Sequence, residues 1–442
     1  MNTSNPAPVP APEPTGNPMT LARLDKLRAD IRDRAGTNLG FPDATDLDVA
    51  ALLPLAGTLL NNVGAPFGPV GPYRNHTKAF ELHVVQQLAD LFHAPLDDRW
   101  GYMPAGGTEG THCALWLART RFPDAVVVCS TAAHYSVARI ADMLRMPLLT
   151  VPTDDRDEIS YDQLTMLLRR HRRRSRRNTP VVVVASIGTT MTEAIDDVAK
   201  IHTALDAAAV PAELRWVHAD AALAGIPLGL LDRADRPAFD FADGSTSIVV
   251  SGHKFLGVPT PCAVLIVRDS ARPGHHSASP SAPDTVHGRH IDYTGSLDTT
   301  VAGSRSGHAA LMAWWALQTW GLDGLRHRAR QARELAAATT ARLHDIDWPA
   351  WRHPLAFTVV MDRPPQPVLD RWPLATSNHR AHLICMPGKT MAMVEHFIAD
   401  LRRAAGAATA VAVAAVRTVP PSQRHGSALA PIATSQDGSA SC

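Results

Sequence analysis

The sequence predicts an α/β protein with a large domain built on a mostly parallel sheet and a smaller C-terminal α+β domain. Between residues 76 and 267, short apolar runs rich in β-branched residues alternate with segments whose apolar residues recur at helical spacing. Strands that alternate with helices form a largely parallel sheet, with ligand groups at the carboxyl ends of the strands. A chain of 442 residues is long enough for one large domain and a second, smaller one.

The apolar runs are the expected strands, and the segments with helical spacing are the expected helices. Strands are expected at 126–129, 148–151, 181–187, 216–218, 247–250, 262–267, 357–360 and 382–385. Helices are expected at 80–92, 111–121, 135–144, 161–170, 197–209, 303–320, 325–343 and 391–402. Upstream, Thr20 should cap a helix with one apolar face, made of Leu21, Leu24, Leu27 and Ile31. Residues 49–60 should form a second helical segment.

Composition divides the chain into five parts. Residues 1–18, rich in Pro and Ala, should be a disordered tail, and residues 418–442 a flexible one. Between them we expect an N-terminal helical segment at 19–60, the large domain at 61–320 and the small domain at 321–417. The Gly- and Pro-rich stretch 61–74 should be a long loop, and long loops inside a domain are more often functional than linking.

Charge, cysteine content and hydropathy exclude several classes of protein. The 43 Lys and Arg balance the 42 Asp and Glu, so no field would recruit nucleic acid or a membrane. The five cysteines form no CxxC pair and resemble small buried side chains of a reduced compartment. We find no signal peptide, no stretch approaching the roughly 20 apolar residues of a membrane span, and no metal-ligand spacing. A soluble, cytoplasmic protein without nucleic-acid, membrane or metal partners is expected.

The arginine-rich run at 169–177 has two interpretations. It could bind nucleic acid or an acidic partner, since it holds seven arginines in nine residues. An isolated run between a helix and a strand is more typical of a solvated helix end, which is the interpretation that we favour.

Two charged residues follow predicted strands. Lys254, in Ser251-Gly252-His253-Lys254, follows the run 247–250. A lysine held at a strand end is partly desolvated, which lowers its pKa and makes its amine available for a Schiff base. Asp220 follows the run 216–218, and a buried acid there needs a cationic partner such as a pyridinium N–H. The small Ala222 leaves room for a flat ring.

Two further features suit a phosphorylated, planar ligand. Gly106-Gly107-Thr108-Glu109-Gly110 comes directly before a predicted helix and offers unobstructed backbone amides, a hydroxyl and a helix N-terminus, which together suit a phosphate. His134 follows another strand, where its ring could lie over a planar ligand. Glycines before helices are often plain turns, and a lone histidine is often structural, so the argument depends on the combination.

The combination resembles the fold type I (aspartate aminotransferase-like) pyridoxal-phosphate enzymes, and among them the group II amino-acid decarboxylases. It is most similar to the bacterial histidine decarboxylases and the plant serine decarboxylases. The resemblance runs from about residue 40 to residue 401. Its motifs are Asn61-Asn62-Val63-Gly64, Gly106-Gly107-Thr108-Glu109-Gly110, His134-Tyr135-Ser136-Val137-Ala138, Ile187-Gly188-Thr189-Thr190, His218-Ala219-Asp220-Ala221-Ala222-Leu223, Ser251-Gly252-His253-Lys254, Gly303-Ser304-Arg305, Gly307-His308 and Leu374-Ala375-Thr376-Ser377.

The resemblance implies a role for each candidate residue. Lys254 would form a Schiff base with pyridoxal 5'-phosphate, His134 would stack on its ring, and Asp220 would pair with the ring nitrogen. The phosphate would be held by Gly107, Thr108, Ser251 and His253, and the ring would be lined by Thr190 and Ala222. Polar candidates for reading the substrate side chain are Tyr73, His76 and Ser304.

The implied activity is α-decarboxylation of an L-amino acid to its amine and CO₂, with histidine to histamine as the leading expectation. Serine or an unusual amino acid of specialised metabolism is the alternative substrate, and a non-catalytic binding protein on the same fold is the alternative of another class. The resemblance also implies a homodimer with the active site at the interface, in which the loop 61–74 closes the neighbour's pocket.

Three positions depart from the family pattern. Ala65 stands where relatives carry an acidic residue, and Thr111 and Ser306 each stand where asparagine is common. The segment 270–290 is longer and richer in Ser, Pro and His than expected. None of these changes removes a cofactor residue, but Ala65 and the long segment could reshape the substrate pocket.

Overall fold

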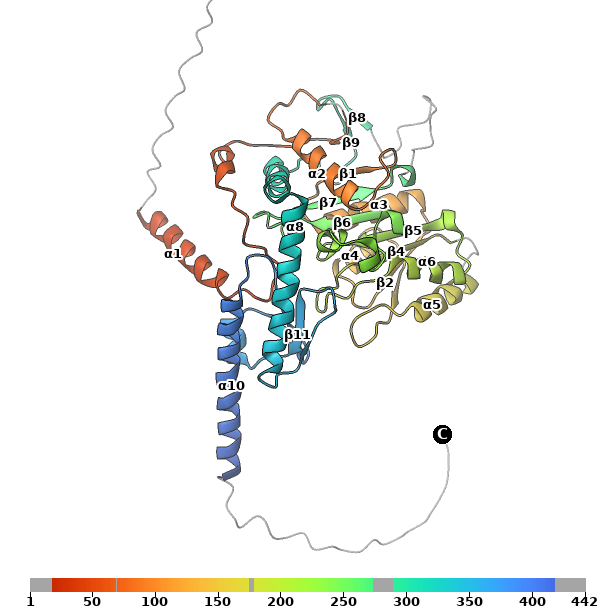
Figure 1. Cartoon of the computed structure of the whole chain (residues 1–442). Helices are drawn as coiled ribbons and strands as arrows, with labels where there is room; N and C mark the ends of the chain where they lie inside the picture. The colour runs from red at the N-terminus through yellow and green to blue at the C-terminus, as the bar shows by residue number, and fades with distance from the viewer. Residues whose placement is uncertain (1–17, 69, 175–178, 273–288, 418–442) are drawn as a thin grey trace, which may run out of the picture.

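A computed structural model describes residues 18–68, 70–174, 179–272 and 289–417, with side chains up to residue 405 (Figure 1). The expectations for both tails, for most of the segment 270–290 and for the end of the arginine run lie outside these residues.

A seven-stranded sheet forms the centre of the larger part of the chain, in the order β1-β7-β6-β5-β4-β2-β3. Its strands are β1 (Trp100–Tyr102), β2 (Val126–Ser130), β3 (Leu148–Val151), β4 (Val181–Ser186), β5 (Arg215–Asp220), β6 (Ser247–Ser251) and β7 (Ala263–Val267). Neighbours from β3 to β6 pair in parallel, whereas β7 pairs antiparallel with both β6 and β1. The predicted mostly parallel α/β sheet is confirmed.

Helices cover both faces of this sheet. One face packs against α2 (Lys78–Leu91), α5 (Tyr161–Arg174), α6 (Val198–Ala207) and the first half of α8 (Gly307–His344). The other face packs against α3 (Gly107–Arg121) and α4 (Ser136–Met143). Along β4, Val181 and Val183 belong to the first core while Val182 and Val184 belong to the second. Because both faces are buried, the strands are continuously apolar rather than alternating.

The helix α8 leads from the large sheet to a second, smaller one (Figure 1). Residues 303–320 and 325–343, predicted as two helices, belong largely to one element that bends at Gly321, whose φ of 57° and ψ of 179° are not helical. The small sheet is antiparallel, in the order β10-β11-β13-β12, and packs with α8 and α10 (Met391–Arg417). Its strands are β10 (Ala350–Trp351), β11 (Thr358–Asp362), β12 (Ala375–Ser377) and β13 (Arg380–Ile384). The division into two domains near residue 320 stays a prediction.

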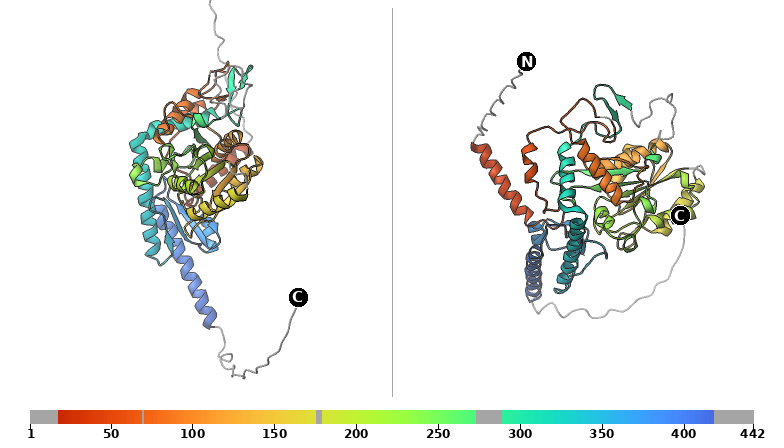
Figure 2. Two further views of the ribbon diagram at one scale, coloured as in Figure 1. Left: turned by 90° about the vertical axis from the view of Figure 1, so that its right-hand side faces the viewer. Right: turned by 45° about the horizontal axis from the view of Figure 1, so that its top comes forward.

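The N-terminal part differs most from expectation. The helix α1 (Pro18–Ala35) forms, but it begins before Thr20 and its predicted apolar face is exposed. Figures 1 and 2 show it projecting from the rest of the chain. The helix expected at 49–60 is wrong, because only the 3₁₀ turn η1 (Ala50–Leu55) forms there. That turn contains Pro54 and has no buried residue, so no packing sustains a longer helix.

Several short elements were not predicted, since two to six residues carry too little periodicity. They are β1, β10, β12, the hairpin β8 (Arg289–Ile291) and β9 (Ser296–Asp298), α7 (Gly225–Gly229), α9 (Gln366–Arg371), and the 3₁₀ turns η2 (Ala212–Leu214), η3 (Arg233–Asp235), η4 (Phe241–Asp243) and η5 (Asp269–Ala271). The helix α3 also begins four residues earlier than predicted, at Gly107.

Other expectations can be compared directly with the described residues. Cys113, Cys129, Cys262 and Cys385 are free thiols and buried, as predicted. In the arginine run, Arg169 donates to the Ala207 carbonyl at the end of α6, at 3.1 Å from Nε and 2.9 Å from Nη2. No helix in the described ranges is long and apolar enough to cross a bilayer. Within the same ranges, no three His, Cys, Asp or Glu residues gather as a metal site.

Candidate active site

A cavity of about 260 Å³ lies where β4, β5 and β6 end and α3 begins. This is the edge of a parallel sheet at which α/β proteins bind their ligands. All nine residues that we predicted for the cofactor line it, and they come from five separate stretches of sequence. They are Gly107, Thr108, His134, Thr190, Asp220, Ala222, Ser251, His253 and Lys254.

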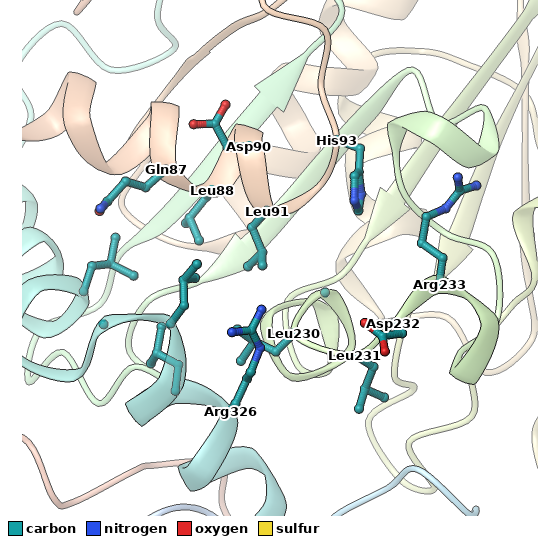
Figure 3. Close-up of a pocket in the computed structure, with 15 residues that line it drawn as sticks. Gln87, Leu88, Asp90, Leu91, His93, Leu230, Leu231, Asp232, Arg233 and Arg326 are labelled. Atoms are coloured by element: carbon teal, nitrogen blue, oxygen red, sulfur yellow. The ribbon is translucent and has the colours of Figure 1, made fainter.

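A larger cavity, of about 650 Å³, lies elsewhere, between α2, α7 and the bend of α8 (Figure 3). Leucines from α2, from α8 and from the turn after α7 form much of its lining. Four of its ionic groups have protein partners, in the pairs Asp90–Arg99, His93–Asp240, Arg233–Asp243 and Arg326–Asp323. None of the predicted site residues lines this cavity, so the larger of the two cavities is not the candidate active site.

Asp220, at the end of β5, and Lys254, three residues after the neighbouring β6, both line the smaller cavity. Burial lowers the pKa of the Lys254 amine, and the charge of Asp220 acts in the opposite direction. Burial likewise raises the pKa of the Asp220 carboxyl, while Lys254 and His134 counteract it. Each group therefore reduces the cost of burying the other's charge. A lysine with a lowered pKa is a nucleophilic amine, which is the property that a Schiff-base lysine needs.

The two histidines of the site are held by their Nδ1 atoms. His134 Nδ1 lies 2.7 Å from Ser136 Oγ, and burial is the main cause that lowers the pKa of its ring. His253 Nδ1 lies 2.9 Å from the Cys262 carbonyl and 3.2 Å from the Cys262 nitrogen. Burial lowers the pKa of His253 as well. With Nδ1 engaged in both rings, Nε2 is left for a ligand in the cavity.

The beginning of α3 forms a cradle for an anion. The first N–H groups of an α-helix have no partner within the helix and attract negative charge. The N-cap residue is Gly106, which has no side chain to accept a bond from these N–H groups. A Cβ at Gly107 would lie 3.3 Å from Ser251 Oγ and 3.4 Å from the Ala222 Cβ, so a side chain there would fill the cradle. Glu109 braces the turn by accepting from the Ala105 N–H at 2.8 Å.

The loop between β4 and α6 forms the opposite wall. Thr189 and Thr190 line the cavity, together with Gly188, whose φ of 98° favours glycine. Hydrogen bonds within the loop fix its conformation. The Glu193 N–H donates to the Thr189 carbonyl at 2.9 Å, and the Ala194 N–H donates to Thr189 Oγ1 at 3.0 Å.

Two motifs that carry no cofactor residue meet in a buried polar network. Arg305 pairs with Glu81 and donates from Nη2 to the Gly64 carbonyl at 2.6 Å. Glu81 also accepts from Asn62 Nδ2 at 2.8 Å and from the Met103 N–H at 2.9 Å. Because Met103 leads into the glycine-rich turn, this network ties the motifs at 61–64 and 303–308 to the anion cradle.

The three substrate candidates do not reach the cavity within one chain. Tyr73 donates to the Leu59 carbonyl at 3.3 Å, and Ser304 Oγ accepts from Asn61 Nδ2 at 3.1 Å. His76 is half-buried, and burial lowers its pKa. Ala65 is buried and donates its N–H to the Leu297 carbonyl of β9, so it is not part of the cavity rim of its own chain.

The other two departures from the family pattern have structural roles. Thr111 Oγ1 lies 3.3 Å from Nε2 of the buried His218, and Ser306 is the N-cap of α8. Sequence reasoning also missed part of the cavity lining, although all of the missed residues except Ser186 lie within two positions of predicted ones. They are Gly106, Tyr135, Ser136, Ser186, Gly188, Thr189 and Leu223.

The sequence of this chain is similar to those of known proteins. The family model of the pyridoxal-dependent decarboxylase conserved domain matches residues 75–347. The chain belongs to this family. It is 39% identical over 381 residues to a histidine decarboxylase of Mesorhizobium japonicum, covering 86% of this chain and 97% of that protein. It is 33% identical to a histidine decarboxylase of Vibrio campbellii, covering 86% of this chain and 95% of that protein.

Solved structures of decarboxylases share the fold. The L-methionine decarboxylase of Streptomyces sp. 590 matches with a TM-score of 0.75 at 24% identity, covering 88% of this chain and 96% of that chain. A glutamate decarboxylase of Lactobacillus brevis matches with a TM-score of 0.71 at 17% identity, covering 91% of this chain and 95% of that chain. The protein is thus an amino-acid decarboxylase that depends on pyridoxal phosphate.

The residues at the cavity fit this cofactor. The cradle at Gly107 suits its phosphate, because a Cβ would occupy that space. Asp220 is a carboxylate whose burial calls for a cationic partner, and Lys254 is an amine with a lowered pKa. An anion site, an acid and a nucleophilic amine around one small cavity are the set of groups that pyridoxal phosphate requires.

Replacement of Asp220 by Asn tests the importance of the buried charge. We expect kcat/KM of Asp220→Asn, at saturating cofactor, to fall by about 100-fold or more, because a preorganised charge is lost while the side-chain size is kept. Steady-state assay of CO₂ release measures it. Asp162→Asn, on the exposed side of α5, is the matched control and should behave as the parent. Activity of Asp220→Asn within a few-fold of the parent would contradict the assignment.

Proposed function

We propose that the nine cavity residues hold pyridoxal phosphate and support α-decarboxylation of an L-amino acid. Lys254 would bind the cofactor through its amine, and Gly107, Thr108, Ser251 and His253 would hold its phosphate. When bound, the cofactor supplies an electron-accepting ring for the electron pair left as the α-carboxylate departs as CO₂. Asp220 would keep a proton on the ring nitrogen, His134 would lie against the ring, and Thr190 and Ala222 would line it. The convergence of Lys254 and Asp220 in one cavity carries this proposal.

Histidine is the substrate that we propose. Support comes from relatives that are histidine decarboxylases. They are 33–39% identical to this chain, and the matches cover most of their length. Serine or an unusual amino acid remains the alternative. Family membership and the complete set of cavity residues argue against the non-catalytic alternative, in which the fold serves only for binding.

A panel of amino acids assayed for CO₂ release tests the substrate. We expect histidine to be turned over with a kcat/KM at least about 100-fold above serine and aliphatic amino acids. A site that hydrogen-bonds a polar substrate group rejects analogues lacking that group by such factors or more. Preference for serine or another amino acid would refute histidine while leaving the decarboxylase assignment intact.

We further propose that the protein is a homodimer whose active site is completed by the neighbouring subunit. The apolar face of α1 is unpartnered in one chain, with Leu21, Leu24, Leu27 and Ile31 between 45% and 54% exposed. A helix with such a face requires a surface to cover it. A second copy fits, because Tyr73 and the loop around it also lie outside the cavity of their own chain.

Light scattering tests the assembly. We expect a mass twice that of the chain at assay concentration, with dissociation and loss of activity in Leu27→Glu, because a charge would then be buried in an apolar interface. Met166→Glu places the same charge at an exposed methionine of α5 and should remain dimeric. An active monomer of the parent protein would refute the proposed assembly.

A further inference from the structure

Glu193 links the wall of the cofactor cavity to the small C-terminal sheet. It lies in the loop between β4 and α6 and is 1% exposed. Its Oε2 accepts from the Thr358 N–H at 2.9 Å and from the Phe357 N–H at 3.2 Å. Both donors lie at the beginning of β11, so one carboxyl group satisfies two backbone groups of the other sheet.

The backbone at Glu193 is unfavourable for a residue with a side chain. Its φ is 58°, in the left-handed region that glycine adopts far more readily than glutamate. A residue held in such a conformation is a reason to look for a function of its side chain. At this position the side chain accepts from the N–H groups of both Phe357 and Thr358.

A second contact fixes the same loop to the same sheet. His382 of β13 places Nδ1 at 3.0 Å from the Met191 carbonyl and Nε2 at 3.1 Å from the Gly40 carbonyl. Within the loop, Thr189 is bonded to both Glu193 and Ala194. A displacement at Glu193 would therefore move Thr189 and the adjacent Thr190 at the cavity wall.

We propose that Glu193 is a positioning residue, which anchors the Thr189–Thr190 wall to the C-terminal sheet and thereby sets the affinity for pyridoxal phosphate. The inference rests on the proposed cofactor site. It adds a determinant of binding that touches neither cofactor nor substrate.

The burial of Glu193 sets the direction in which the anchor responds to pH. Burial raises the pKa of Glu193 from 4.5 to about 7. The hydrogen bonds from Thr358 and Phe357 and the charge of Arg333 on α8 lower this pKa but do not outweigh burial. Cys385, after β13, and Arg352, which lies near Arg333 and Cys385, are further ionisable groups on this side, and His382 of β13 contacts the Met191 carbonyl of the same loop. Since the pKa is raised in the anchored state, the neutral carboxyl favours anchoring. Anchoring therefore weakens as the pH rises from 4.5 to about 7.

Three variants distinguish loss of the Glu193 anchor from a general effect on folding. Glu193→Gly removes the carboxyl and relieves the left-handed backbone. Glu193→Gln keeps an acceptor oxygen and cannot ionise. Glu158→Gln is the control, because Glu158 contacts His353 (3.4 Å) before β11 and is not a partner of Glu193, Phe357 or Thr358 in the anchoring bonds. Cofactor affinity is measured on cofactor-free protein by quenching of tryptophan fluorescence during titration with pyridoxal phosphate. Hydrogen exchange of residues 188–194 is measured without cofactor.

We expect Glu193→Gly to bind pyridoxal phosphate about tenfold more weakly and to exchange the loop amides faster, because the two bonds to β11 are lost. Glu193→Gln should restore parental affinity and bind at least as tightly as the parent at about pH 8, where the parental carboxyl is ionised. Glu158→Gln should match the parent. Parental affinity in Glu193→Gly overturns this inference alone, as does failure of Glu193→Gln to restore binding. A parent protein that binds no cofactor overturns the proposed function as well.

Discussion

The electrostatic attraction between the buried side chains of Asp220 and Lys254, which line one small cavity, is the interaction on which the rest of the site depends. A lone carboxylate or ammonium is costly to bury, and the two groups reduce that cost for one another. The sheet provides their placement: Asp220 ends β5 beside Ser186 of β4 and Val249 of β6, and Lys254 follows β6 by three residues. Parallel strands bring these ends to the same edge, so residues far apart in sequence share one wall.

Supports around this pair hold the cavity open at its two sides. On one side, the network of Glu81, Arg305 and Met103 fixes the chain that leads into α3, whose N-terminus is the anion cradle. On the other side, the loop after β4 is closed on itself and anchored to the small sheet through Glu193. Within one chain, the motifs at 61–64 and 303–308 therefore affect the cavity through main-chain position rather than by contact.

The convergence of the nine predicted residues on one cavity could be predicted because each follows a strongly apolar strand or begins a helix, and strand ends of a parallel sheet converge. Sequence could not reveal Glu193, since its partners in β11 are 164 and 165 residues away and depend on how the two sheets are placed. The helix expected at 49–60 failed because Pro54 lies inside it and no packing buries its apolar residues. By contrast, α1 forms without an interior proline, although no partner within the described chain covers its apolar face.

The most direct test of the account is the covalent site of the cofactor. Purified protein saturated with pyridoxal phosphate is reduced with borohydride, digested and examined by mass spectrometry. The account predicts loss of the cofactor's visible absorption band on reduction and a phosphopyridoxyl group on Lys254 alone among the chain's lysines. A protein that binds no cofactor, or a label on another lysine such as Lys200 or Lys389, would contradict it.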